Sequence, residues 1–173
     1  PVEAWTSEEA LKDFPKHINE KRLYEDSGYR DRIKQIEGEN FHHWNTALHE
    51  GDPGHHESPA WYEEDYDDSA WQIVDMFSRE WGNDGLNPQA GSHWLRKDFT
   101  MPAESAGKAG ILRLGCIVYS DSVYVNGHFV GTTGYQYPPR IYKIPAGVLH
   151  EGENNVTVRI ISNGGQPSFV PEK

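Results

Sequence analysis

The sequence contains Ser-Val-Tyr-Val-Asn-Gly-His-Phe-Val at positions 122–130, the clearest indication of its fold class. Asn126 and Gly127 suit the two central positions of a type I′ turn, where both residues take a positive φ. The residues on either side of them are typical of strands, so the stretch predicts a β-hairpin. Within it, Val123, Val125 and Phe129 are expected to line one face of the pleat.

Further strand-like segments lie on both sides of the hairpin at short intervals, and turn signals rich in Gly, Pro and Asn separate them. The predicted strands are residues 71–77, 92–100, 109–118, 122–125, 128–131, 140–144 and 155–162. In the last of them, Val156, Val158 and Ile160 alternate with Thr157 and Arg159, which predicts one apolar and one solvated face. The pattern predicts a mainly β domain, an antiparallel β-sandwich over residues 61–173.

Residues 1–60 follow a helical and polar pattern instead. Thr6 and Glu9 have the spacing of a capping box, and Pro15 is expected to end that first turn. A longer helix is predicted from residue 29 to residue 48, because apolar residues recur there close to the 3.6-residue period. These residues are Tyr29, Ile33, Ile36, Phe41, Trp44 and Leu48. We expect their face to pack on the sandwich or on further parts of a longer protein.

The composition argues against several classes of function. Asp and Glu number 27 against 16 Lys and Arg, a net charge of −11 that disfavours contact with nucleic acid or an anionic membrane surface. No apolar run approaches the roughly 20 residues that span a bilayer. Cys116, the single cysteine, lies in an apolar run and is predicted to be a small buried side chain rather than a nucleophile. The chain starts at Pro1 and is interpreted as a piece of a longer protein.

Four motifs of the sandwich half carry a family resemblance. They are Asp67-Asp68-Ser69-Ala70-Trp71, Trp94-Leu95-Arg96-Lys97-Asp98-Phe99-Thr100-Met101-Pro102, Leu112-Arg113-Leu114-Gly115 and Val123-Tyr124-Val125-Asn126-Gly127. Together they resemble the sugar-binding-like jelly-roll domain of family 2 glycoside hydrolases, a galactose-binding-like fold. The resemblance implies a jelly-roll form of the β-sandwich.

Three further stretches are Pro1–Ser7, Gly134–Pro145 and Phe169–Lys173. On these, the whole chain more narrowly resembles the segment inserted into the catalytic domain of sialate O-acetylesterases. The resemblance implies a periplasmic or secreted parent that removes O-acetyl groups from sialic acid by serine-hydrolase chemistry. It places the family's Gly-Gln-Ser-Asn nucleophile block and general-base His outside this chain. The implied partners are the remainder of the parent esterase and sialylated glycans.

No catalytic residue, metal or cofactor is predicted within the chain. Ser92 and His93 are neighbours on a predicted strand and point to opposite faces, so they cannot form a nucleophile–base pair. A zinc hypothesis arises from five histidines, but their spacing does not bring three or four ligands onto one ion. They are His42, His43, His49, His55 and His56. The acidic run 63–68 could bind calcium, although a solvated turn in which Asp68 or Ser69 caps the next strand is favoured.

Aromatic side chains are the usual platform for sugars, because a pyranose face stacks on an aromatic ring. The candidate carbohydrate-binding or cleft-lining residues are Tyr135, Tyr137, Arg140, Trp81 and Trp94. Tyr135, Tyr137 and Arg140 flank the rigid pair Pro138-Pro139, and Arg140 could bind the carboxylate of a sialic acid. The favoured alternative is that Arg140 pairs with an acidic residue of the parent domain.

Three hypotheses for function remain open. The favoured one is a non-catalytic accessory β-sandwich of a carbohydrate esterase, which shapes the active-site cleft or orients the domains. The second is an autonomous carbohydrate-binding module that uses the loop aromatics. The third is a structural or protein-interaction domain that docks through its helical apolar face.

Overall fold

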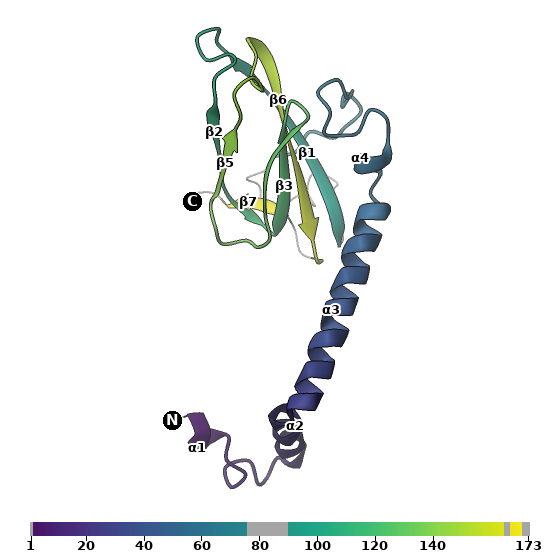
Figure 1. Cartoon of the computed structure of the whole chain (residues 1–173), viewed down its shortest axis with the longest axis vertical. Helices are drawn as coiled ribbons and strands as arrows, with labels where there is room; N and C mark the ends of the chain where they lie inside the picture. Colours follow the sequence, from purple (N-terminus) through teal and green to yellow (C-terminus); the bar gives the residue numbers. More distant parts are fainter. Residues whose placement is uncertain (1, 76–89, 165–166, 171–173) are drawn as a thin grey trace. The chain divides into compact units, whose positions relative to one another are not determined.

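The computed structural model describes residues 2–75, 90–164 and 167–170 (Figure 1). The chain divides into two compact units, Pro1–Glu50 and Gly51–Lys173, and each is described by itself. Trp81, one of the predicted site residues, lies outside the described residues.

The first unit is helical. It contains α1 (Val2–Trp5), α2 (Pro15–Glu25) and α3 (Ser27–Glu50), and the predicted helix 29–48 lies inside α3. The turn that precedes Pro15 ends at Asp13, as expected, and Pro15 itself opens α2 at a position where its missing N–H costs nothing. The capping hydroxyl that the structure shows is that of Ser7, whose oxygen accepts from the Ala10 amide at 3.1 Å.

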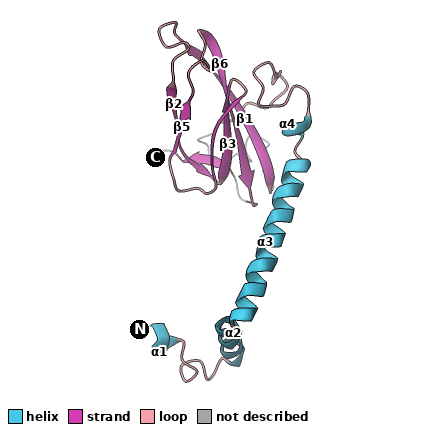
Figure 2. Cartoon of the chain, viewed as in Figure 1, coloured by secondary structure: helices cyan, strands magenta, loops and turns pink. Residues whose placement is uncertain are grey.

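The second unit is an antiparallel β-sandwich, as predicted, and the short helix α4 (Pro53–His56), which was not predicted, precedes it (Figure 2). Its described strands are β1 (Gly91–Met101), β2 (Gly110–Val118), β3 (Ser120–Val125), β4 (His128–Thr133), β5 (Arg140–Ile144), β6 (Gly152–Ser162) and β7 (Ser168–Val170). One sheet has the order β1-β6-β3-β4 and the other β5-β2-β7. Six of the predicted strands are confirmed. Residues 71–75 form no strand, and the short β7 was not predicted.

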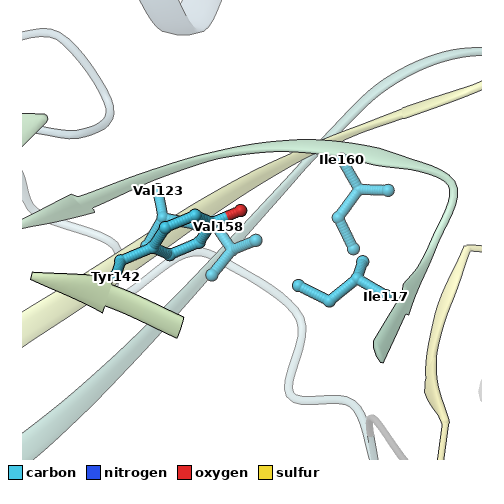
Figure 3. Packing of buried hydrophobic residues seen from close by; sticks show 5 residues of the cluster. All are labelled: Ile117, Val123, Tyr142, Val158 and Ile160. Carbon is cyan, nitrogen blue, oxygen red and sulfur yellow. The ribbon is translucent and has the colours of Figure 1, made fainter. Parts of the chain in front are cut away.

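The core lies between the two sheets. Its main cluster consists of Ile117, Val123, Tyr142, Val158 and Ile160, drawn in Figure 3. These residues come from β2, β3, β5 and β6, so a single cluster joins both sheets. Burial of each such aliphatic side chain contributes about 1.5–3 kcal/mol. The core therefore fixes β3 and β5, the strands whose residues hold the loop described below.

The hairpin forms with the predicted turn, since Asn126 and Gly127 have φ values of 47° and 76°. The expected place of Phe129 was wrong. The two-residue turn pairs Val125 with His128 and Tyr124 with Phe129, so that Phe129 shares a sheet face with Tyr124 and is 55% exposed. Because cross-strand partners point to the same face and neighbours along a strand to opposite faces, Phe129 lies on the face away from Val125 and the core.

The solvated face predicted for the last strand was also wrong. Thr157 and Arg159 of β6 are 0% and 6% exposed. They are covered because residues 51–71, which we call the strap, contact the outer face of the β1-β6-β3-β4 sheet. Asp52 of the strap pairs with Arg159, and Arg96 of β1 donates both to the strap and to Thr157. Both faces of this sheet are therefore buried along much of β6.

Candidate functional site

The strongest candidate site is the loop between β4 and β5, residues 134–139, which is held from below by one buried arginine. Arg140 is fully buried at the first position of β5. Its Nη1 donates to the carbonyl oxygens of Pro138 at 2.7 Å and Gln136 at 3.3 Å. The thiol of Cys116 donates to the Tyr137 carbonyl between them, at 3.1 Å. Three consecutive carbonyls are thus held against the sandwich, which fixes the loop backbone.

Arg140 is in turn held by groups from the β3 side of the sandwich. Its Nε donates to Asp121 Oδ1 at 2.5 Å, and its Nη2 donates to the Tyr119 carbonyl at 2.7 Å. The Tyr142 hydroxyl donates to the other Asp121 oxygen at 2.6 Å. Burial raises the pKa of Asp121, and the hydrogen bonds from Tyr142 and Arg140 offset this only in part. Burial and the bond to Asp121 raise the pKa of Tyr142 to about 12.

This geometry corrects the predicted role of Arg140. Every nitrogen of its guanidinium donates to the protein, and the side chain has no exposed surface. It is therefore placed neither to bind a ligand carboxylate nor to reach an acidic residue of another domain. Its carboxylate partner is Asp121 of the same sandwich. Arg140 is a positioning residue that fixes the loop, because a guanidinium can satisfy a carboxylate and several carbonyls at once.

Tyr135 and Tyr137 are the residues that this loop presents to solvent. They are 60% and 71% exposed, and their rings form an edge-to-face pair with centroids 6.3 Å apart. Because the backbone beneath them is fixed, the two rings form an exposed aromatic surface on a rigid base. Such a surface can stack on a sugar ring at little cost in conformational entropy. Their assignment as carbohydrate-contacting residues stays a prediction.

Trp94 was expected to be an exposed platform, and the structure shows it buried at 8% exposure. It lies on β1 under the strap, where its indole N–H donates to Asp52 Oδ1 at 2.8 Å. Asp52 also accepts from Arg159 at 2.6 Å and from Ser92. Burial alone would raise the pKa of Asp52, but these hydrogen bonds outweigh it and lower the pKa. This cluster fastens the strap to the sheet.

Aromatic rings fill the remaining space under the strap. Tyr62 stacks on Tyr124 with centroids 4.5 Å apart and planes inclined by 14°, and Trp61 meets Trp94 edge to face. Arg96 ties the acidic run to the sheet, since it pairs with Asp68 and donates to the Trp61 and Glu63 carbonyls. The run is therefore a structural element of the strap, and the turn-capping carboxylate is that of Asp67, which accepts from the Ser69 amide.

Among the described residues, no three His, Cys, Asp or Glu side chains are grouped so that they could hold a metal ion. His55 instead packs edge to face against Trp94, with ring centroids 5.1 Å apart. His150, which precedes β6, bonds Glu64 of the strap at 2.5 Å. That bond raises the pKa of His150, so this contact responds to pH.

Sequence reasoning missed Asp121, Tyr142 and Asp52, which organise these two polar clusters. Asp121 and Tyr142 lie on strands whose alternation points them inward, beside Val123 and Ile144. The sequence did contain a signal for this pair. Strand alternation points both Asp121 and Arg140 inward, and because buried charges are found in pairs, this indicates a buried ion pair. Asp52 gave no such signal, since it stands in a Gly-Asp-Pro-Gly turn.

No family model and no curated protein matches the chain. The chain is similar over part of its length to part of a glycoside hydrolase, the β-glucuronidase of Ruminococcus gnavus. One structure of that enzyme is 29% identical over 42% of this chain and 12% of its own, with a TM-score of 0.39. Its complex with N1-substituted uronic isofagomine is 28% identical over 43% of this chain and 13% of its own, with a TM-score of 0.40.

This chain therefore spans 12–13% of the length of those enzymes. Among the described residues, no helix is long and apolar enough to cross a membrane.

Proposed function

We propose that this chain is a non-catalytic accessory β-sandwich of a carbohydrate-active enzyme, and that the loop 134–139 forms part of the wall that contacts the carbohydrate. The observation that carries the proposal is the contrast within this loop. Its backbone is held by Arg140 and Cys116, while Tyr135 and Tyr137 are directed to solvent. A loop whose role is to pack against the sandwich would bury its aromatic rings. Here a buried ion pair holds the backbone, and two rings remain exposed to solvent.

The parent that fits the sequence resemblance is a periplasmic or secreted sialate O-acetylesterase. The loop and the first strand residue after it lie inside Gly134–Pro145, the longest of the stretches on which that resemblance rests. In such a parent, the sandwich would shape one side of the cleft, and the nucleophile and base would come from the catalytic domain. The sequence encoded upstream of Pro1 tests this directly, because a Gly-Gln-Ser-Asn block is expected there.

The functional test is made in the full-length parent acting on an O-acetylated sialoside. Replacement of Tyr135 and Tyr137 by Ala is expected to raise KM with kcat nearly unchanged, because the rings bind substrate without touching the reacting atoms. Loss of about 1 kcal/mol of stacking corresponds to roughly a fivefold rise in KM. Unchanged KM and kcat in the double variant would refute a substrate-contacting loop.

A matched control is present in the helical unit. Tyr24 is 59% exposed and forms an edge-to-face pair with Tyr29, so it resembles Tyr135 in exposure and packing. Tyr24→Ala is expected to leave KM unchanged. The isolated chain provides a second check, since it should show no ester hydrolysis. Turnover by the isolated chain would contradict the non-catalytic assignment.

A second candidate is an autonomous carbohydrate-binding module, which the exposed Tyr135–Tyr137 pair favours. It differs from the first in that the chain would bind glycans without the parent. Titration of the isolated chain with sialosides and galactosides, followed by NMR, distinguishes the two. Shifts confined to residues 134–139 at millimolar sugar would support the module, and their absence would exclude it for those sugars.

A further inference from the structure

The helix α3 of the first unit carries an exposed apolar face. Ile36, Phe41 and Trp44 are 51%, 64% and 40% exposed, and the rings of Phe41 and Trp44 stack with centroids 6.5 Å apart. No described residue of α3 is fully buried. Three large apolar side chains on one helix exceed the scattered exposure that a soluble surface normally shows, and such a patch marks an interaction site.

The spacing of this face is symmetric along the helix. The steps between its six apolar residues are 4, 3, 5, 3 and 4, which is the same series in either direction. A two-fold axis across the helix between residues 38 and 39 therefore places each apolar residue opposite another one. Ile36 meets Phe41 of a second copy, Ile33 meets Trp44, and the outer pair is Tyr29 with Leu48. A surface that matches itself under a two-fold axis is what a symmetric dimer requires.

The polar residues of the helix fit the same arrangement. Between the two inner apolar pairs, Glu37 falls opposite Asn40 of the second copy, where an amide can donate to a carboxylate. Residues 27–38 contain three cations and two anions, a net charge of +1, and residues 39–50 contain two glutamates, a net charge of −2. Antiparallel helices bring the basic half of each copy beside the acidic half of the other, whereas parallel helices would bring like charges together.

We propose that α3 is a self-association surface, and that two copies of this chain pair through it as antiparallel helices centred between residues 38 and 39. The proposal is independent of the loop 134–139, because every residue that it uses lies in α3. It assigns the exposed helical face a partner of defined chemistry, namely the same face of a second copy.

The first test is the mass of the full 173-residue chain in solution, by light scattering and sedimentation at several concentrations. The wild type is expected to approach twice its 19.7 kDa as the concentration rises. Ile36→Glu is expected to weaken association by about tenfold or more, since it buries two charges at the centre of the interface. Ile73, 96% exposed in the other unit, provides the matched control, and Ile73→Glu should associate like the wild type.

Circular dichroism verifies that both variants keep their helix and sandwich, which is expected because both isoleucines are exposed. If Ile36→Glu loses helix, Phe41→Glu is measured in its place. A wild type that stays monomeric at the highest concentration would overturn the proposal, and the face would then belong to another partner. A dimer that survives Ile36→Glu or Phe41→Glu with its helix intact would overturn it as well.

The second test measures orientation by pulsed electron spin resonance between nitroxide labels on two copies. Cys116 is replaced by Ala, and a single cysteine is placed at Gly38 or at Ala47. In an antiparallel pair, residue 38 of one copy lies at the height of residue 39 of the other, so the two labels at position 38 are at nearly the same height. Residue 47 lies at the height of residue 30, so the two labels at position 47 are about 26 Å apart along the helix axis. The Ala47 label should therefore report the longer distance. Equal distances at both positions would indicate parallel helices and refute the proposed pairing.

Discussion

Replacement of Arg140 by Met is the most informative perturbation of the sandwich. Met keeps much of the apolar stem but removes the guanidinium, which leaves the Asp121 carboxylate buried at 2% exposure beside a single remaining donor, the Tyr142 hydroxyl. Removal of one partner from a buried ion pair typically costs 3–5 kcal/mol. Because Tyr142 still donates to Asp121, we expect a loss near the lower end, about 3 kcal/mol. That is a large fraction of the 5–15 kcal/mol by which a domain is stable.

The loss is measured by urea unfolding of the full chain, followed through the tryptophan fluorescence of the sandwich. Arg113→Met serves as the matched control, since Arg113 lies on the outer face of β2 and is exposed, and a change within about 0.5 kcal/mol is expected there. Hydrogen exchange at residues 134–139 provides an independent measurement. The amides of this loop should exchange faster in Arg140→Met, because the Gln136 and Pro138 carbonyls lose their donor.

A double-mutant cycle with Asp121→Asn decides whether the ion pair is the cause. Once the buried carboxylate is gone, loss of Arg140 leaves no uncompensated charge, so the double variant should be more stable than the sum of the single losses predicts. A coupling of about 2 kcal/mol is expected for such a contact. Coupling near zero, or a loss below about 1 kcal/mol in Arg140→Met, would refute the view that this pair holds the loop.

Two further predictions concern the strap. Gly54→Ala is expected to destabilise the sandwich by about 1–3 kcal/mol, because a Cβ there would clash with the Trp94 ring. Gly38→Ala is the control, since a Cβ at Gly38 meets no atom within 4 Å, and it should stabilise the helix by up to about 1 kcal/mol. The midpoint temperature of thermal unfolding is measured for both variants. Equal shifts of this temperature would contradict the close packing of Gly54 against Trp94. The His150–Glu64 contact raises the pKa of His150, so its stabilisation is fully present below the unfolded value of about 6.5 and is lost as pH rises through the folded value. The free energy of unfolding, measured from pH 5.5 to 8.5, should therefore fall with rising pH in the wild type and change less in Glu64→Gln.

The candidate site was predictable only in part. Tyr135 and Tyr137 could be found from the sequence, because two aromatic residues beside Pro138-Pro139 mark a rigid exposed loop. Arg140 was found as well, but its role was not, because its partner Asp121 lies 19 residues away on another strand. Trp94 looked like an exposed ring and is buried, since the strap that covers it comes from 42 residues earlier in the chain.

Local sequence patterns were enough to predict most elements of this protein: the type I′ hairpin at 122–130, six strands of an antiparallel sandwich and the helix within α3. These depend on turn chemistry and on side-chain periodicity, which act between residues close together in the chain. The tertiary structure alone decided which polar residues are buried. Thr157 and Arg159 have the pattern of a solvated strand face, and only the path of the strap across that face makes Asp52 the partner of Arg159. Burial depends on what covers a surface, and that is a contact between residues far apart in sequence.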